Sequence, residues 1–289
     1  MQISSSDIVL QVSPHGAELT SFLVRGQQLL WQADPQFWRR HAPILFPIVG
    51  KVFNNTYHVD GQLYQLPQHG FARDSQFQLI NQSPTELELQ LSSSPDTLKV
   101  YPYPFTLTAH YQLCQSVLTC RWTVHNPGER PLYFQLGAHP AFNFLDFAPQ
   151  NPIYGYLQFY RQGAPVHQLT VTRLSASGHA TQQTYALPLP DGLLAVTPQL
   201  FQHDALVLEG SQADRVVLLD RHRRPYLQTT FQAPVLGIWS PVAAPFCCIE
   251  PWYGRTDPEG FAADISQRAY IQALPPQQSF TFTYTIQAL

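Results

Sequence analysis

Hydrophobic and polar residues alternate along several stretches of the chain. Over residues 85–91, 105–113, 118–124 and 280–286, every second side chain is apolar or aromatic and most of the intervening ones are polar. A period of two, rich in β-branched and aromatic residues, is typical of half-buried antiparallel strands. The spacing of an amphipathic helix is nowhere sustained beyond a turn or two. The pattern therefore predicts an almost all-β protein.

Residues 34–40 are the one place where a short helix is predicted, with Asp34 as N-cap and Pro35 in the first helical position. Turn sequences containing Gly, Pro and Asn separate the strands. No flexible linker, low-complexity tract or repeat divides the chain, so we expect residues 1–289 to form a single domain. So many strands have to stack as two sheets or close up, because exposed sheet edges promote aggregation.

The composition narrows the class of protein further. Hydrophobic residues make up 44 % and charged residues 12 %, against ~25 % charged residues in an average soluble domain; this excludes a disordered or coiled-coil protein. A net charge of −3 gives no basic field for nucleic acid or an anionic membrane. No apolar run reaches a membrane span, and residues 1–4 do not resemble a signal peptide. We expect a cytoplasmic protein with neither nucleic acid nor membrane as a partner.

The sequence contains neither the cysteine spacing of a metal site nor the common cofactor-binding motifs. Cys114, Cys120, Cys247 and Cys248 show neither CxxC nor zinc-site spacing, and we expect reduced, mostly buried thiols. The GxGxxG, HExxH and GxSxG motifs are missing, and Gly50-Lys51 lacks the flanking residues of a P-loop. Because the histidines are scattered singly, spacing predicts no metal site, and no cofactor is expected.

Three segments break the alternation with polar residues set among Gly, Pro and aromatic residues. They are residues 67–73, with 43–51 just upstream, then 137–143 and 248–254. In each, an ionisable side chain stands beside a residue that restricts the backbone. A proline follows both His139 and Glu250, and it holds them extended.

The chemistry of these ionisable residues suggests acid–base catalysis on a sugar. Glu250 follows an apolar run expected to be a buried strand, and partial desolvation at the strand end raises a carboxyl pKa toward that of a general base. The Trp252-Tyr253 pair beside it offers flat faces for a sugar ring. His139, with an unperturbed pKa of ~6.5, suits proton transfer. Each residue has an ordinary structural alternative: a surface glutamate or a core histidine. By spacing alone each segment is a weak signal.

Taken together and in this order, the three segments resemble the aldose 1-epimerase (galactose mutarotase-like) family, and most closely its bacterial branch typified by the LacX proteins. The resemblance extends from residues 16–19 to the last strand, and the HGFAR sequence of residues 69–73 is its most specific element. It implies a large antiparallel β-sandwich, in agreement with the alternation. It also implies cofactor-free interconversion of the α and β anomers of a free sugar.

The resemblance also implies roles for individual residues. Glu250 matches the general base that takes the proton of the C1 hydroxyl, and His139 matches the general acid that protonates the ring oxygen. His69 matches a histidine that hydrogen-bonds the sugar near the reacting oxygens. Arg73 resembles a substrate-binding arginine, and Asp204 is similar, more loosely, to an aspartate that accepts bonds from sugar hydroxyls.

Lys51 departs from the family pattern, in which an arginine commonly follows the glycine. Lysine keeps the charge and loses the bidentate fork, so both its contact with the ligand and the identity of the sugar stay open. A hexose-6-phosphate 1-epimerase is one alternative, with Arg39, Arg40, Lys51 and Arg73 clustered around the phosphate. A non-catalytic carbohydrate-binding protein is another. A glycosidase needs two flanking carboxylates, and only Glu250 has a suitable context. The oligomeric state is left open.

Overall fold

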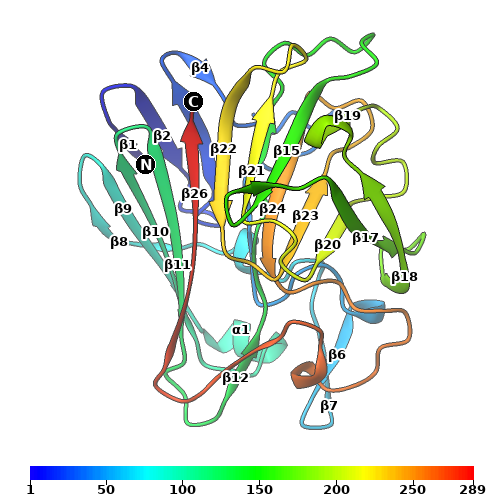
Figure 1. Cartoon of the computed structure of the whole chain (residues 1–289). Coiled ribbons are helices and arrows are strands. Elements are labelled where there is room, and N and C mark those ends of the chain that lie inside the picture. The colour runs from blue at the N-terminus through cyan, green and yellow to red at the C-terminus, as the bar shows by residue number, and fades with distance from the viewer.

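Two large antiparallel sheets form the body of the protein, whose computed structural model describes all residues from Met1 to Leu289 (Figure 1). The ten-stranded sheet has, in spatial order, β16 (Ala164–Pro165), β15 (Gly155–Arg161), β21 (Arg215–Leu219), β22 (Pro225–Phe231), β26 (Ser279–Ala288), β11 (Val117–His125), β10 (Thr106–Cys114), β9 (Glu86–Ser92) and β8 (Gln78–Gln82), with β19 (Leu193–Val196) beside β15. The eight-stranded sheet has β18 (Ala180–Pro188), β17 (Gln168–Leu174), β20 (Leu206–Glu209), β23 (Val235–Trp239), β24 (Phe246–Tyr253), β13 (Leu136–Ala138) and β5 (Ile44–Leu45), with β14 (Ala141–Asn143) beside β24.

Smaller elements complete the fold. A four-stranded sheet contains β1 (Gln2–Ser4), β2 (Ile8–Val12), β3 (Leu19–Val24) and β4 (Gln27–Gln28). Two ribbons pair β6 (Thr56–Val59) with β7 (Gln62–Gln65), and β12 (Leu132–Phe134) with β25 (Gln272–Leu274). The helices are α1 (Pro95–Val100) and the 3-10 turns η1 (Phe53–Asn55), η2 (Ala72–Asp74), η3 (Pro190–Gly192) and η4 (Ile265–Gln267).

The four alternating stretches of the sequence are neighbouring strands of the larger sheet. They correspond to β9, β10, β11 and β26, which lie side by side in the order β26-β11-β10-β9. In Figure 1 the C-terminal strand β26, drawn in red, lies between β11 and β22. The prediction of half-buried antiparallel strands is confirmed.

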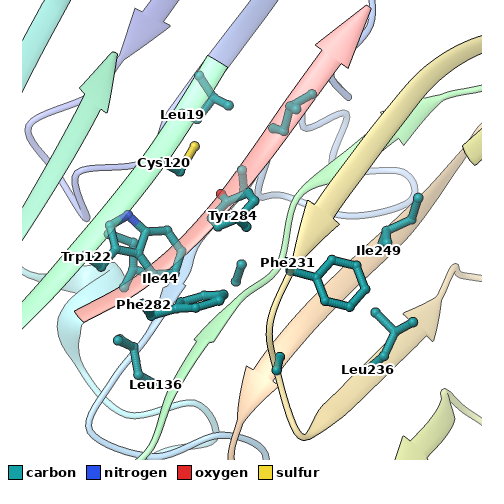
Figure 2. Packing of buried hydrophobic residues seen from close by; sticks show 14 of the residues in the cluster. Leu19, Ile44, Cys120, Trp122, Leu136, Phe231, Leu236, Ile249, Phe282 and Tyr284 are labelled. Carbon is teal, nitrogen blue, oxygen red and sulfur yellow. The ribbon is translucent and has the colours of Figure 1, made fainter. Parts of the chain in front are cut away.

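The core lies between the two large sheets, as in a sandwich. Trp122 of β11 and Phe282 of β26 are almost completely buried, as are Ile249 of β24 and Leu236 of β23 from the smaller sheet. Figure 2 shows these side chains in the same layer of the core. Aromatic residues contribute large apolar areas to such a layer. The prediction of an antiparallel β-sandwich is confirmed.

The helix predicted over residues 34–40 is wrong. The chain makes one turn there: Asp34 Oδ1 accepts from the Gln36 N–H at 2.9 Å, and the Asp34 carbonyl accepts from Trp38 N at 3.0 Å. The helix does not continue beyond Trp38. The carbonyl of Trp38 accepts a hydrogen bond from the indole N–H of Trp31, and the indole ring of Trp38 stacks on Phe246 of β24. Tertiary contacts therefore override a good N-terminal signal.

The α-helix α1 was not predicted, although its start carries a capping box. Ser94 accepts from Thr97 N at 3.2 Å, Thr97 Oγ1 accepts from Ser94 N at 2.8 Å, and Pro95 occupies the first turn. All four cysteines are free, and three of them are buried while Cys114 is exposed. None of the helices is both long and apolar enough to span a bilayer.

Candidate active site

His139 and Glu250 face each other because of the register of three strands. Ala141 of β14 pairs with Cys248 of β24, and β13 pairs with the end of β24 in the same antiparallel register. Continuing this register places His139, in the break between β13 and β14, directly opposite Glu250. Opposed residues of an antiparallel pair point to the same face of the sheet. Two ionisable groups far apart in the sequence thus become neighbours.

The alternation along β24 decides which of its side chains lie near the candidate site. Cys247 and Ile249 point into the core between the sheets. Cys248, Glu250 and Trp252 are on the outer face and belong to separate clusters or to the site. The expectation that Glu250 ends a strand is wrong, because β24 continues beyond it. Its side chain is consequently more deeply buried than expected, and the residue is 1 % exposed.

A cavity of about 340 Å³ covers this outer face, a size suited to a small-molecule ligand. The cavity brings together seven of the residues that the sequence predicted for the site, while Tyr253 lies outside its lining. These residues are Lys51, His69, Arg73, His139, Asp204, Glu250 and Trp252. They come from loops and strands spread over most of the chain, so their convergence is a property of the fold.

The closest ionisable pair in the cavity is His139 and Glu250. Nε2 of His139 lies 3.1 Å from Oε2 of Glu250, with side-chain exposures of 9 % and 1 %. Burial, to which the charge of Asp204 adds, raises the pKa of the Glu250 carboxyl well above its usual range. Burial lowers the pKa of His139 to about 3. Both shifts favour the uncharged carboxyl and the uncharged imidazole over their charged forms.

His69 is held in the cavity wall by a left-handed turn. Its φ is 67° and that of Gly70 is 71°, and a Cβ at position 70 would lie 2.3 Å from the carbonyl oxygen of Phe46. The N–H of Gly50 donates to His69 Nδ1 at 3.1 Å, and Nε2 lies 3.2 Å from the side-chain amide of Gln68. In a neutral ring whose Nδ1 accepts, the proton is on Nε2. Burial and the nearby His139 lower the pKa of His69 well below its usual value. His69 is therefore a neutral hydrogen-bonding group.

Two cations and one carboxylate also line the cavity. Lys51 Nζ donates to the Ser177 carbonyl at 2.8 Å, and the carboxylate of the exposed Asp204 lies near it across Gly178. Arg73 Nη2 donates to a backbone carbonyl at 2.6 Å, while its buried Nε has no hydrogen-bond partner. Burial and the charge of Arg40 lower the pKa of Arg73 to about 10, so it stays charged at neutral pH.

The other two arginines of the expected cationic cluster lie elsewhere. Arg39 is exposed and outside the cavity lining, and Arg40 pairs with Asp74 at 2.8 Å. Of the four cations considered for a phosphate site, only Lys51 and Arg73 line the cavity.

Trp252 occupies a space made by two glycines of adjacent strands. A Cβ on Gly137 would approach its indole to 2.6 Å, and one on Gly237 to 2.4 Å, so no larger residue fits beside the ring. The expectation that Tyr253 forms a sugar platform together with Trp252 is wrong. Tyr253 points to the opposite face of β24 and packs edge-on against aromatic residues of β26.

Sequence reasoning missed two tryptophans of the site. Trp38 stacks on His139 with ring centroids 4.7 Å apart and an angle of 25°, and Trp239 meets the same ring edge-on at 5.8 Å. Both line the cavity. Trp239 ends an apolar strand, and Trp38 stands between a phenylalanine and two arginines that the sequence analysis assigned to a helix. Neither lies within the three segments that interrupt the alternation.

A buried ion pair supports the cavity wall behind Lys51. Arg268 Nε lies 2.7 Å from Asp257 Oδ1, and their side chains are 0 % and 3 % exposed. The Asp257 N–H donates to the Lys51 carbonyl at 2.9 Å, and the Lys51 N–H donates to Thr256 Oγ1 at 3.2 Å. The pair therefore fixes the backbone that carries two lining residues.

Comparison with known proteins agrees with this architecture. The family model for aldose 1-epimerase matches residues 1–260. The chain belongs to the aldose 1-epimerase family. This family member is 28 % identical over 276 residues to the plasmid-borne protein LacX of Lactococcus lactis subsp. lactis, covering 88 % of this chain and 87 % of that protein.

Solved structures of the family have the same fold. A galactose mutarotase related enzyme from Lactobacillus acidophilus superposes with a TM-score of 0.92 at 30 % identity, covering 100 % of this chain and 97 % of that one. A galactose mutarotase-like protein from Lactobacillus casei gives a TM-score of 0.92 at 27 % identity, with coverage of 100 % and 99 %. The family and the fold inferred from the sequence are confirmed.

Proposed function

We propose that this aldose 1-epimerase family member is an isomerase that interconverts the α and β anomers of a free aldohexose. The observation that carries the proposal is the direct 3.1 Å contact between Glu250 and His139 at a buried position in the cavity. Anomer exchange needs one group that removes a proton from the C1 hydroxyl and another that donates a proton to the ring oxygen. A carboxyl and an imidazole on adjacent strands can perform both transfers on one bound sugar.

The reaction proceeds by ring opening and reclosure. Glu250 takes the proton of the C1 hydroxyl, the C1–O5 bond breaks, and the proton of His139 moves to O5. The open-chain aldehyde then rotates about its C1–C2 bond. The ring then recloses. O5 attacks the other face of C1 and returns its proton to His139, while Glu250 returns a proton to the C1 oxygen. Atoms and charge balance without a co-reactant.

The reactive form of the pair is a carboxylate next to an imidazolium. Burial opposes this charged form, because it raises the pKa of the carboxyl and lowers that of the imidazole. Sugar hydroxyls can donate to Glu250 Oε2, which has no hydrogen-bond partner in the protein, and hydrogen bonds to the charged form favour it. Sugar binding therefore promotes the charged form that the reaction needs.

The remaining lining residues fit the task of holding a sugar. Neutral His69 presents an Nε2–H donor, and Asp204 accepts from sugar hydroxyls. Lys51 and Arg73 donate, and Trp252 offers an apolar face to the ring. Three or more hydrogen-bonding groups around one aromatic face give both affinity and orientation.

Polarimetry on freshly dissolved α-glucose and α-galactose tests the proposal. We expect the approach to anomeric equilibrium to accelerate in proportion to the protein concentration. If the protein binds sugar with no acceleration, it is a carbohydrate-binding protein on an epimerase fold and the proposal is wrong.

A hexose-6-phosphate 1-epimerase is the second candidate, and Arg73 favours it. Its guanidinium lines the cavity, and its buried Nε makes no hydrogen bond and has only a 3.7 Å contact with Asp74 Oδ2. An arginine N–H is a suitable donor to a phosphate oxygen. Catalysed exchange measured by NMR with glucose and with glucose 6-phosphate separates the two. A kcat/KM at least tenfold higher for the phosphate ester would identify it as the substrate.

A further inference from the structure

Three side chains of metal-binding type meet on the outer face of β24. A nitrogen of His139, the sulfur of Cys248 and a carboxylate oxygen of Glu250 all lie within 4.8 Å of one another, and all three residues are buried. Cys248 and Glu250 alternate on this face, and His139 stands opposite Glu250 in the register described above. Spacing along the sequence gave no sign of this cluster, because the register alone creates it.

Two atoms of the cluster have no hydrogen-bond partner in the protein. They are Oε2 of Glu250, which lies 3.1 Å from Nε2 of His139 without hydrogen-bond geometry, and Nδ1, the other ring nitrogen of His139; both are completely buried. Buried polar atoms are nearly always satisfied, and an unsatisfied carboxylate oxygen is a natural ligand for a cation. His139 and Glu250 also line the cavity, so a cation between them would be reachable from solvent and could keep a water ligand.

The donor set selects the kind of cation. Thiolate sulfur, imidazole nitrogen and carboxylate oxygen, plus a water, are ligands of Zn²⁺, whereas Mg²⁺ and Ca²⁺ prefer oxygen alone. Ligand distances of 2.0 to 2.3 Å place the ligand atoms of a tetrahedral zinc roughly 3.3 to 3.6 Å apart. The 3.1 Å separation of His139 and Glu250 is close to this value. The ligand atoms of the cluster lie at most 4.8 Å apart. The Cys248 sulfur therefore has to move by no more than roughly 1 to 1.5 Å for all three atoms to reach a tetrahedral zinc.

We propose that His139, Cys248 and Glu250 form an inhibitory site for Zn²⁺ and similar thiophilic divalent cations. The metal displaces the thiol proton of Cys248 and the proton of the Glu250 carboxyl where it is protonated. Both protons are released to solvent, and the metal occupies the two groups that the sugar reaction uses. Metal and sugar therefore exclude each other. Metal binding itself is independent of the proposed function, and only the inhibition rests on it.

Direct binding to the full-length, chelator-treated protein provides the first test. Zn²⁺ titrated against a chromophoric chelator should bind one equivalent, and Cd²⁺ should produce the ultraviolet charge-transfer absorbance of a thiolate ligand. Cys248→Ala should weaken binding at least 100-fold and abolish that absorbance. Cys247→Ala is the matched control, because Cys247 is equally buried but points into the core. Cys248→Ser is a second variant of nearly native volume, and thermal denaturation checks the fold of each.

Inhibition provides the second test. Zn²⁺ should raise the apparent KM for the sugar, a chelator should restore it, and the Cys248→Ala protein should turn over normally and resist Zn²⁺. Cys248 does not line the cavity and has no part in the proton transfers, so basal turnover is expected to survive.

The possible results separate the two proposals. Failure of the wild-type protein to bind one equivalent, or binding that persists in both Cys248 variants, would overturn the metal site. Stoichiometric binding that depends on Cys248, in a protein that accelerates no anomer exchange, would uphold the metal site and refute the proposed function.

Discussion

Replacing Glu250 with Gln removes the proposed base while keeping its shape and its hydrogen-bonding oxygen. Loss of a general base lowers the rate by ~10²–10⁴, which corresponds to about 3–5 kcal/mol in the activation barrier. We expect the upper part of this range, because the residue is only 1 % exposed and solvent therefore has little access to it as a substitute base.

The same substitution should leave the fold nearly unchanged. Burial raises the pKa of Glu250 well above its usual range, which favours the neutral carboxyl, and Gln matches that form in shape and charge. The free energy of unfolding should change by no more than about 1 kcal/mol, the size of one neutral hydrogen bond. Sugar affinity, followed by tryptophan fluorescence, should remain within about fivefold, because only one of several contacts is altered.

The assay is anomer exchange followed by polarimetry, with urea denaturation run in parallel. Glu129→Gln makes the same chemical change at an exposed position and should have wild-type kinetics. A Glu250→Gln protein that is folded and retains wild-type turnover would refute the assignment of the base. A large loss of stability would instead refute the neutral state of the unliganded carboxyl.

Three further substitutions separate roles within the site. His139→Asn should lower kcat at least about tenfold more than His69→Asn, since only His139 is the proposed proton donor. His69→Asn should act mainly on KM. Equal losses of kcat in steady-state kinetics would mean that both histidines take part in proton transfer. Trp38→Leu should lower kcat about tenfold, because the stacked indole stabilises the imidazolium, and Trp38→Phe should retain most of the activity; loss of stability without loss of kcat would contradict this. Arg268→Met leaves Asp257 buried without its partner and should cost about 3–5 kcal/mol in urea denaturation; a change below 1 kcal/mol would show that water reaches the pair.

The sequence predicted the parts of the fold that depend on local pattern. The alternation over β9, β10, β11 and β26 identified the strands, because each has one face on the core and one in solvent. The turn at Asp34 was taken for a helix, because the contacts that stop it come from residues distant in the sequence. The helix α1 was detectable from its Ser94 capping box, and the signal was overlooked.

The sequence identified most residues of the candidate site, but it did not predict how they are arranged in space. His69, His139 and Glu250 stood out because polar residues next to Gly and Pro interrupt strands, and all three line the cavity. That Glu250 lies opposite His139, and that Cys248 joins them, follows from strand register, which no local pattern specifies. Trp38 and Trp239 lie outside those interruptions, and their approach to His139 depends on contacts between distant residues.

The placement of the acid and base on paired strands has a consequence for how this protein could be altered. Their spacing is set by backbone hydrogen bonds within one sheet, while Lys51, Arg73 and Asp204 approach from loops and turns around it. If the proposed function is correct, loop replacements at those three positions should change which sugar is accepted while the proton transfers are retained. A one-residue deletion within β24 would instead destroy the proton-transfer pair. It would turn the side chains beyond the deletion to the opposite face of the sheet, so that core residues face the cavity and cavity residues face the core. The sheet is thus the reusable part of the molecule for design, and the loops are the part to vary.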